Sequence, residues 1–412
     1  MDLTRCLRCT PALSADAASE LRQDMIFDCC KWDPQAGDVS VLAPFALILT
    51  PTCWRELAAA AEALYRETLR AEAEIAARSD LISRLKLPAA LARALRPRDP
   101  PRVSTDALRI MRFDFHPARE GWRVSEVNSD VPGGYIESSG FARLMAARFP
   151  ETAVAADPVE VLADSLRRRH KNSDTLGLVH ATAYLDDRQV MIFLQRQLSR
   201  RGMSSQLLSP ADITWRETGA FAGDTPLSAL LRFFPVEWLP NLPGSTWKNF
   251  FRPAPIPQIN PGQAAISQSK RFPLTWPQLQ EPLARWKELS PETREWSESL
   301  ADSPEWVCKP SFGRVGDGLG LHGATEPREW RDIVRARRQR PPEWIAQRRF
   351  NSLPLETPAG PRHVCLGLYV IDGQAAGIYG RIAARPLIDH LAQDVAVLVD
   401  TSATANTPPL SP

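Results

Sequence analysis

Residues 109–130 read RIMRFDFHPAREGWRVSEVNSD. Apolar and polar residues alternate in IMRFDFH and in WRVSEVN, and the turn-rich HPAREG lies between them, so the stretch predicts an antiparallel hairpin. Because side chains alternate between the faces of a strand, Arg112 and Asp114 share one face of the first strand. Glu126 and Asn128 share one face of the second strand. We therefore expect one apolar core face and one face that carries the charges.

The polar face of this hairpin suits a hard cation. Carboxylate and amide oxygens are ligands for Mg²⁺ or Mn²⁺ rather than Zn²⁺, so the predicted metal ligands are Asp114, Glu126 and Asn128. The alternative is an ordinary solvated hairpin face, on which Arg112 pairs with Asp114 or Glu126. Such surface ion pairs are common and contribute little to stability. On spacing alone the two interpretations are equally good.

The same segments resemble a known family. RFDF at 112–115 and EVN at 126–128, with Asp130 close behind, are similar to paired segments of the glutathionylspermidine synthetase family, a circularly permuted branch of the ATP-grasp ligases. The resemblance implies that Arg112 contacts the transferring phosphate and that the two carboxylates and the amide hold magnesium. It also makes Asp130 an expected substrate contact.

Four further segments match the family in its order: LLRFFPVEWLP (230–240), NPGQAAISQSKRFPLTW (260–276), EWVCKPSFGRVGDGLGLHG (305–323) and GLYVIDGQAAGIYGRIA (367–383). The matches imply a substrate-contacting carboxylate at Glu237 and the first nucleotide lysine at Lys270. They also place Arg381 at the C-terminal catalytic arginine of the family. Gly133, in the Gly-Gly pair after the hairpin, lets backbone amides approach a substrate closely.

The glycine-rich segment KPSFGRVGDGLGLHG is a second candidate site. Its lysine, Lys309, precedes the glycines, whereas the lysine of a P-loop follows them. The glycines allow a tight hairpin whose amides point at phosphate oxygens, and the alternative is a glycine-rich surface hairpin. EWIAQRRF at 343–350 resembles the strand that meets adenine. The resulting candidates for ATP binding are Lys270, Lys309, Gly313, Arg314, Gly316, Gly318 and Gln347.

In the middle of the chain, the spacing of apolar residues alternates between that of strands and that of a helix. TLGLVHA, DDRQVMIFLQRQLSRRG and SSQLLSP predict a strand, helix and strand of a small parallel sheet, without the GxGxxG of a dinucleotide site. The expected fold class is α/β with α+β elements: a circularly permuted ATP-grasp core plus a small parallel-sheet pre-ATP-grasp domain. The expected divisions are 1–155 (first part of the core), 156–260 (pre-ATP-grasp-like substrate domain), 261–345 (nucleotide subdomain), 346–400 (last part of the core) and 401–412 (disordered tail).

Composition narrows the function classes. A net charge of +2 over 412 residues argues against a dedicated nucleic-acid binder. No stretch approaches the ~20 apolar residues of a membrane span, and MDLTRCLRCT lacks the apolar core of a signal peptide. We therefore expect a cytoplasmic enzyme that contacts neither nucleic acid nor membrane. The sequence indicates no oligomeric state.

The seven cysteines suggest a different interpretation. Cys6 and Cys9 form a CxxC, followed by Cys29 and Cys30, so a zinc or redox module is an alternative. No later CxxC or histidine pair completes the usual tetrahedral set. Buried or incidental thiols are the simpler expectation.

The resemblance implies a reaction that uses ATP and two Mg²⁺ ions, or Mn²⁺. A ligase of this kind joins a carboxylate to an amine through an acyl phosphate and releases ADP and phosphate. Glutathione-using members carry NADSAS after the metal-binding Asn, whereas this chain has NSDVPGG, with Val131 and Gly133 at the two serine positions. It also shows no match to the amidase domain of the bifunctional enzymes. We therefore expect substrates other than glutathione and spermidine. The runner-up is an ATP-binding sensor or scaffold without catalysis.

Overall fold

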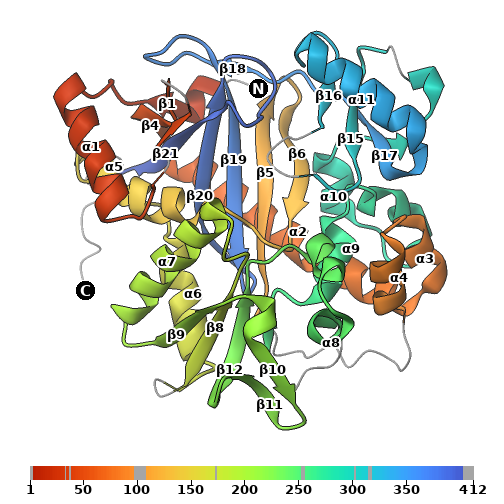
Figure 1. Cartoon of the computed structure of the whole chain (residues 1–412). Coiled ribbons are helices and arrows are strands. Elements are labelled where there is room, and N and C mark those ends of the chain that lie inside the picture. Colours follow the sequence, from red (N-terminus) through yellow and green to blue (C-terminus); the bar gives the residue numbers. More distant parts are fainter. Residues whose placement is uncertain are drawn as a thin grey trace, which may run out of the picture.

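The computed structural model describes residues 3–32, 34–36, 39–96, 108–171, 174–251, 256–300, 303–313 and 318–401. Three main β-sheets organise these residues (Figure 1). The helices are α1 (Ala15–Phe27), α2 (Pro51–Ala77), α3 (Ser79–Arg84), α4 (Ala89–Leu95), α5 (Ala142–Ala146), α6 (Pro158–Arg167), α7 (Leu185–Ser199), α8 (Gly244–Trp247), α9 (Ala265–Gln268), α10 (Ala284–Leu289) and α11 (Pro327–Gln339). No helix of the described segments is long and apolar enough to cross a membrane. The predicted tail lies outside these residues from position 402 onward.

The largest sheet has nine strands and is built from both ends of the chain. Its order is β1-β4-β21-β20-β19-β5-β6, with β18 beside β19 and β7 beside β21. The strands are β1 (Leu7–Cys9), β4 (Leu42–Leu49), β5 (Ile110–Ala118), β6 (Gly121–Asn128), β7 (Thr152–Ala153), β18 (Pro354–Leu355), β19 (Arg362–Ile371), β20 (Gln374–Ala383) and β21 (Gln393–Asp400). β21 and β4 run parallel, so the C-terminal strand lies directly beside an N-terminal one, as the permutation implies.

Alternation along β19 divides the core between the two faces of this sheet. Leu366, Leu368 and Val370 pack in one hydrophobic cluster with the apolar stripe of α2, whereas Tyr369 and Ile371 belong to a second cluster. The helix begins at Thr50, whose side chain accepts a hydrogen bond from the N–H of Cys53. The helix follows directly after β4 (Leu42–Leu49).

The predicted hairpin is confirmed as β5 and β6, with one irregularity. Phe113 pairs with Val127 but Phe115 pairs with Val124, so β6 has an extra residue at this point. This is a β-bulge, which re-aims side chains locally. It turns Val124 as well as Val127 into the core, while both residues between Val124 and Val127, Ser125 and Glu126, reach the cavity. Strict alternation alone does not predict this arrangement.

A second, mixed sheet has the order β10-β11-β12-β8-β9, with β13 beside β12. Its strands are β8 (Thr175–Val179), β9 (Ser204–Leu208), β10 (Ile213–Arg216), β11 (Gly219–Ala222), β12 (Thr225–Arg232) and β13 (Gln258–Ile259). β8, α7 and β9 form the predicted unit, and β8 pairs in parallel with β9 and with β12. The sheet extends beyond the predicted unit because β10 and β11 join it as antiparallel strands.

A third sheet of four antiparallel strands has the order β14-β17-β15-β16, and a two-stranded ribbon pairs β2 (Gln35–Ala36) with β3 (Val39–Ser40). The four strands are β14 (Thr293–Glu295), β15 (Trp306–Pro310), β16 (Gly320–Leu321) and β17 (Trp344–Arg348). Ile333 of α11 packs against Trp306 and Trp344 in a small core of this sheet. The segment EWVCK (305–309) and the expected strand EWIAQRRF (343–350) lie side by side as β15 and β17.

Candidate active site

One cavity of about 550 Å³ is lined by residues of the nine-stranded sheet, the four-stranded sheet and α7, and by Phe233, which follows β12 of the mixed sheet. Most of the predicted site residues line it: Arg112, Asp114, Glu126, Asn128, Gly133, Lys270, Lys309, Gly313, Gln347 and Arg381. Asp130, Glu237 and Gly318 are not part of the lining. Arg314 and Gly316 lie outside the described residues. Segments that are far apart in the sequence thus converge on one cavity.

The hairpin supplies a polar face in which Arg112 clamps Asp114. The Nε and Nη2 atoms of Arg112 donate to the two carboxylate oxygens of Asp114 at 2.8 and 3.1 Å. Asn128 donates to the same carboxylate at 3.0 Å, because it pairs directly with Arg112 across the hairpin. The Nη1 atom of Arg112 donates to the carbonyl of Gly133 at 2.6 Å. Burial opposes the charge of Arg112, but Asp114 outweighs it and raises the arginine pKa well above its usual value.

Glu126 and two lysines form the adjoining charge cluster. The ammonium of Lys270 lies 3.4 Å from a carboxylate oxygen of Glu126 and donates to the carbonyl of Gly313 at 3.1 Å. Burial disfavours the Glu126 carboxylate, yet Lys270 and Lys309 outweigh this and lower its pKa to about 2. Lys309 donates to the carbonyl of Ser125 at 3.3 Å, and burial lowers its pKa to about 8. The cluster therefore holds one ionised carboxylate between two ammonium groups.

The donor chemistry of this face fits magnesium. No three His, Cys, Asp or Glu side chains of the described ranges form a metal-binding group. The candidate metal ligands include only two such side chains, Asp114 and Glu126, and the third ligand is the amide of Asn128; all three line the cavity. Mg²⁺ usually keeps several waters and binds one or two carboxylates plus substrate phosphates. A set of this size therefore suits an ion that arrives with a nucleotide.

One wall of the cavity is apolar and lies beside a polar residue, Gln347. Leu321 packs with Leu387, and Val307 and Leu319 pack against this pair; all four line the cavity. Gln347 of β17 is buried in the same cavity lining, and its Nε2 lies 3.4 Å from the carbonyl of Ser125. Gly318 has a positive φ of 69° just before Leu319, a conformation that favours glycine.

Arg381 lies on β20, which is separated from β5 and Asp114 by β19. Both lysines contact β6, on the other side of β5. Its Nη2 donates to the carbonyl of Asp389 at 2.6 Å, and its Nε lies 3.9 Å from a carboxylate oxygen of Asp394. Burial disfavours the charge, but Tyr379 and Asp394 outweigh it and raise the pKa of the guanidinium. Arg381 is therefore a charged group on the cavity wall.

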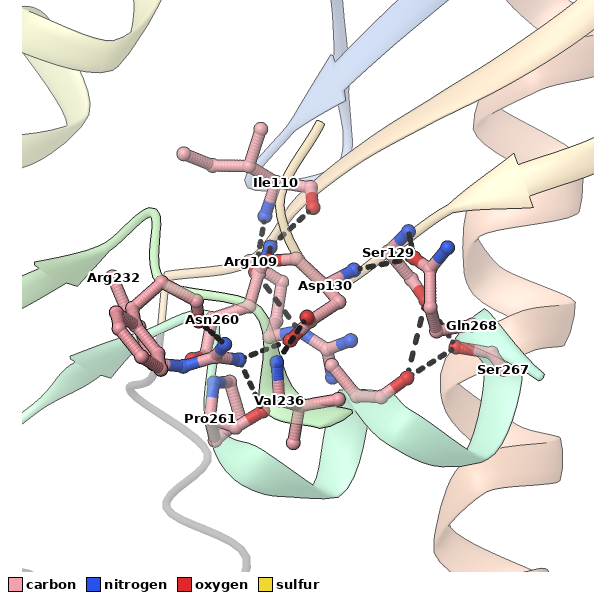
Figure 2. Close-up of polar contacts among 12 residues, drawn as sticks. Arg109, Ile110, Ser129, Asp130, Arg232, Val236, Asn260, Pro261, Ser267 and Gln268 are labelled. Atoms are coloured by element: carbon pink, nitrogen blue, oxygen red, sulfur yellow. Dashed lines mark hydrogen bonds and ion pairs between the residues drawn. The ribbon is translucent and has the colours of Figure 1, made fainter. Parts of the chain in front are cut away.

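Asp130 is held in a buried network away from the cavity (Figure 2). Its carboxylate pairs with the fully buried guanidinium of Arg232 and accepts from the N–H of Val236 at 2.8 Å. Asn260 donates to the backbone carbonyls of Asp130 and Ile110 at 3.1 and 2.8 Å. This network joins the end of the β5–β6 hairpin to β12 of the mixed sheet. It gives Asp130 an architectural position rather than one on the cavity wall.

Glu237 and Gly133 differ in position. Glu237 lies in the 3-10 segment Val236–Asn241 outside the cavity lining, whereas its neighbour Trp238 lines the cavity. Gly133 lines the cavity, and its carbonyl accepts hydrogen bonds from Arg112 and from the hydroxyl of Tyr369.

A further polar group in the cavity is missing from the sequence-based candidates. Lys31 lies 2.7 Å from Glu137 and 3.3 Å from Asp394, and the hydroxyl of Tyr379 donates to Asp394 at 2.8 Å. We call these four residues the Lys31 cluster. Lys31 is 106 residues from Glu137 and 363 residues from Asp394 in the sequence, so no local pattern could have found the group. His116, another cavity residue, contacts the hydroxyl of Ser125 at 3.0 Å, and burial lowers its pKa to about 4.

The alternative of a zinc site centred on Cys6 and Cys9 is wrong. Cys6 forms a disulfide with Cys53, so its sulfur is not available to act with Cys9. Cys9 contacts the carbonyl of Glu356 at 3.6 Å, and Cys29 and Cys30 are buried thiols. Disulfides are rare in the reducing cytoplasm, so the redox state of the Cys6–Cys53 pair bears on the expected location.

Comparisons with known proteins find a matching family and similar solved structures. The profile of the family described as glutathionylspermidine synthase preATP-grasp matches residues 45–400. A glutathione synthetase-like effector (GSS30) from Globodera pallida, solved in its apo form, is similar in structure with a TM-score of 0.60 at 11% identity, over 93% of this chain and 98% of that one. A putative gamma-glutamylcysteine synthetase from Methylobacillus flagellatus has a TM-score of 0.41 at 12% identity, over 78% of this chain and 84% of that one.

No curated protein sequence matches the chain. The likeness to the effector concerns the fold alone, because the two sequences are only 11% identical. The profile match covers most of the chain, including the β5–β6 hairpin, Lys270, Lys309 and Arg381. The chain therefore belongs to the glutathionylspermidine synthase preATP-grasp family.

Proposed function

We propose that the protein is an ATP-dependent ligase that joins a carboxylate to an amine through an acyl phosphate and releases ADP and phosphate. The observation that carries this proposal is the convergence of two charge groups in one cavity. Arg112 and Asp114 come from the hairpin, whereas Lys270 and Lys309 come from segments near the third sheet. This set supplies what phosphoryl transfer requires, which is mainly positioning and charge neutralisation.

The chemistry follows from the residues present. The two lysines would neutralise the nucleotide phosphates, while an oxygen of the substrate carboxylate attacks the γ-phosphorus and ADP leaves. Arg112 would stabilise the charge that develops on the transferring group, and Arg381 would bind the carboxylate or the acyl phosphate. The amine nitrogen then attacks the carbonyl carbon, loses a proton, and phosphate leaves. Asp114, Glu126 and Asn128 would hold magnesium, which when bound offsets phosphate charge.

We also propose the domain division and a substrate class for this ligase. The division at 155, 260, 345 and 400 is supported by the three sheets, although β17 (Trp344–Arg348) crosses the boundary drawn at 345.

Substrates other than glutathione are supported by Val131 and Gly133, because both residues line the cavity where the glutathione-using members carry serines. The non-catalytic sensor is disfavoured, because a protein that only binds nucleotide has less need of a transition-state arginine such as Arg112.

The test is a screen for ADP release over amino acids, small peptides and amines. Hydroxylamine serves as a universal nucleophile, since it captures an acyl phosphate as a hydroxamate even when the natural amine is absent. Arg112→Ala should abolish the signal, while Arg335→Ala, an exposed arginine of α11, should leave it unchanged. Formation of AMP and pyrophosphate would reject the mechanism. Robust synthesis of glutathionylspermidine would show that Val131 and Gly133 do not exclude glutathione.

A further inference from the structure

The side chain of Arg112 crosses a neighbouring strand to reach an aromatic ring. Its Cζ atom lies over the ring of Tyr379, 5.0 Å from the ring centroid. Arg112 belongs to β5 and Tyr379 to β20, and β19 separates these two strands. On β19, Gly367 pairs with Asp114 of β5 and with Tyr379 of β20. Arg112 therefore reaches the ring by passing over β19 beside a residue that has no side chain.

Two glycines leave the space that this contact needs. A Cβ atom at Gly367 would lie 2.7 Å from both the Cδ and the Nε atoms of Arg112, and 3.0 Å from a carboxylate oxygen of Asp114. A Cβ atom at Gly134 would lie 2.7 Å from the ring of Tyr379, and the φ of 98° at Gly134 is a conformation that favours glycine. A side chain at Gly367 would thus displace the arginine, and one at Gly134 would displace the ring.

The Lys31 cluster fixes the ring of Tyr379. The hydroxyl of Tyr379 donates to Asp394 at 2.8 Å, and the same carboxylate lies 3.3 Å from the ammonium of Lys31. Lys31 also lies 2.7 Å from Glu137, and Arg381 lies 3.9 Å from Asp394. The charged groups of the cluster therefore pair with one another and with Arg381. What the cluster offers to the cavity is a ring that is held at its hydroxyl end.

The orientation of the guanidinium decides what Arg112 offers to a ligand. A guanidinium has five N–H groups in one plane. Three of those of Arg112 donate to Asp114 and to the carbonyl of Gly133, so at most two remain for a ligand. The polar contacts hold two edges of the plane, whereas the ring of Tyr379 supports its face. Without the ring the plane can tilt, and the remaining N–H groups then change direction.

We infer that Tyr379 is a positioning residue for Arg112, and that the glycine at 367 makes their contact possible. This inference rests on the ligase proposed above. The ring holds the guanidinium so that its remaining N–H groups meet the oxygens of the transferring phosphoryl group. Phosphoryl transfer depends mainly on positioning, so a tilt of this plane lowers the rate of the chemical step. Nucleotide binding by Lys270 and Lys309 does not depend on the ring.

The test compares variants of the full-length protein by steady-state ADP release, with the acid and amine found in the screen above, and by titration with a non-hydrolysable ATP analogue and magnesium. Tyr379→Leu removes the ring and should lower kcat about tenfold, while Kd for the analogue changes less than about twofold. Tyr379→Phe keeps the ring, so its kcat should stay within about threefold of the wild-type value. Gly367→Ala places a Cβ against Arg112 and should reproduce the lower kcat with an unchanged Kd.

Phe221→Leu is the matched control. Arg216 lies over the ring of Phe221, with its Cζ atom 4.3 Å from the centroid, so the mixed sheet has a contact of the same kind. Phe221 is not part of the described cavity lining, and its loss should leave kcat unchanged.

A double-mutant cycle that needs no substrate tests the contact itself. It joins Arg112→Ala with Tyr379→Leu and measures unfolding in urea. If the two side chains interact, the cycle should show a coupling of about tenfold in the equilibrium constant of unfolding.

The outcomes separate the positioning role from the function. A normal kcat in Tyr379→Leu, equal losses in the Leu and Phe variants, or an equal loss in Phe221→Leu would overturn the positioning role. ADP release by the wild type with additive effects in the unfolding cycle would also overturn it and would keep the ligase. Coupling in the cycle without ADP release from any acid and amine combination would keep the contact and reject the ligase.

Discussion

The buried ammonium of Lys309 predicts that nucleotide affinity falls in mildly alkaline solution. Lys309 is only 4% exposed, and burial lowers its pKa to about 8, with Lys270 acting in the same direction and Glu126 opposing. If phosphates bind the charged form, the apparent Kd is the intrinsic Kd divided by the protonated fraction of the lysine. From a pKa of about 8, affinity should be almost constant below pH 7, about twofold weaker at pH 8 and about elevenfold weaker at pH 9.

The measurement is a titration with a fluorescent, non-hydrolysable ATP analogue at several pH values. Ionic strength must be constant, because salt screens the same interaction. Other shifted groups do not interfere in this window: burial raises the pKa of Cys9 to about 11 and that of Cys308 to about 12, and lowers that of His116 to about 4. The loss of affinity between pH 7 and 9 should therefore report Lys309.

Lys309→Arg is the matched control, because a guanidinium keeps its charge throughout this range. Its Kd should be nearly independent of pH, whatever its absolute value. A wild-type Kd that stays flat to pH 9 would show that Lys309 does not neutralise the phosphates. The same pH slope in the arginine variant would assign the titration to another group.

Three further predictions concern single side chains. Asp114→Asn should remove magnesium-dependent turnover with an unchanged circular dichroism spectrum, because the apolar face of the hairpin is untouched; normal turnover would reject the metal assignment. Arg112→Ala should chiefly lower kcat, whereas Lys309→Ala should chiefly weaken ATP binding, and steady-state kinetics with direct titration distinguish them. Asp130→Asn should lower the free energy of unfolding by about 3–5 kcal/mol, because Arg232 would stay buried without a counter-charge. An unchanged urea midpoint would contradict this.

Local patterns along the chain were sufficient to predict the hairpin and the strand, helix and strand unit. Both depend on side-chain periodicity, which is a property of neighbouring residues. The hairpin places Arg112, Asp114, Glu126 and Asn128 on the cavity wall, as their spacing predicts. The motif resemblance added Lys270 and Lys309, which no periodicity indicates.

The sequence by itself determined which residues carry charge on the hairpin and which segments become strands, since these follow from local alternation and turn residues. Only the tertiary structure decided the rest. The bulge in β6 turns Ser125 toward the cavity, Arg232 draws Asp130 into the interior, and the Lys31 cluster assembles from three distant segments. These outcomes depend on which elements pack together and where a buried charge finds its partner. Such contacts join residues hundreds of positions apart, and no local pattern encodes them.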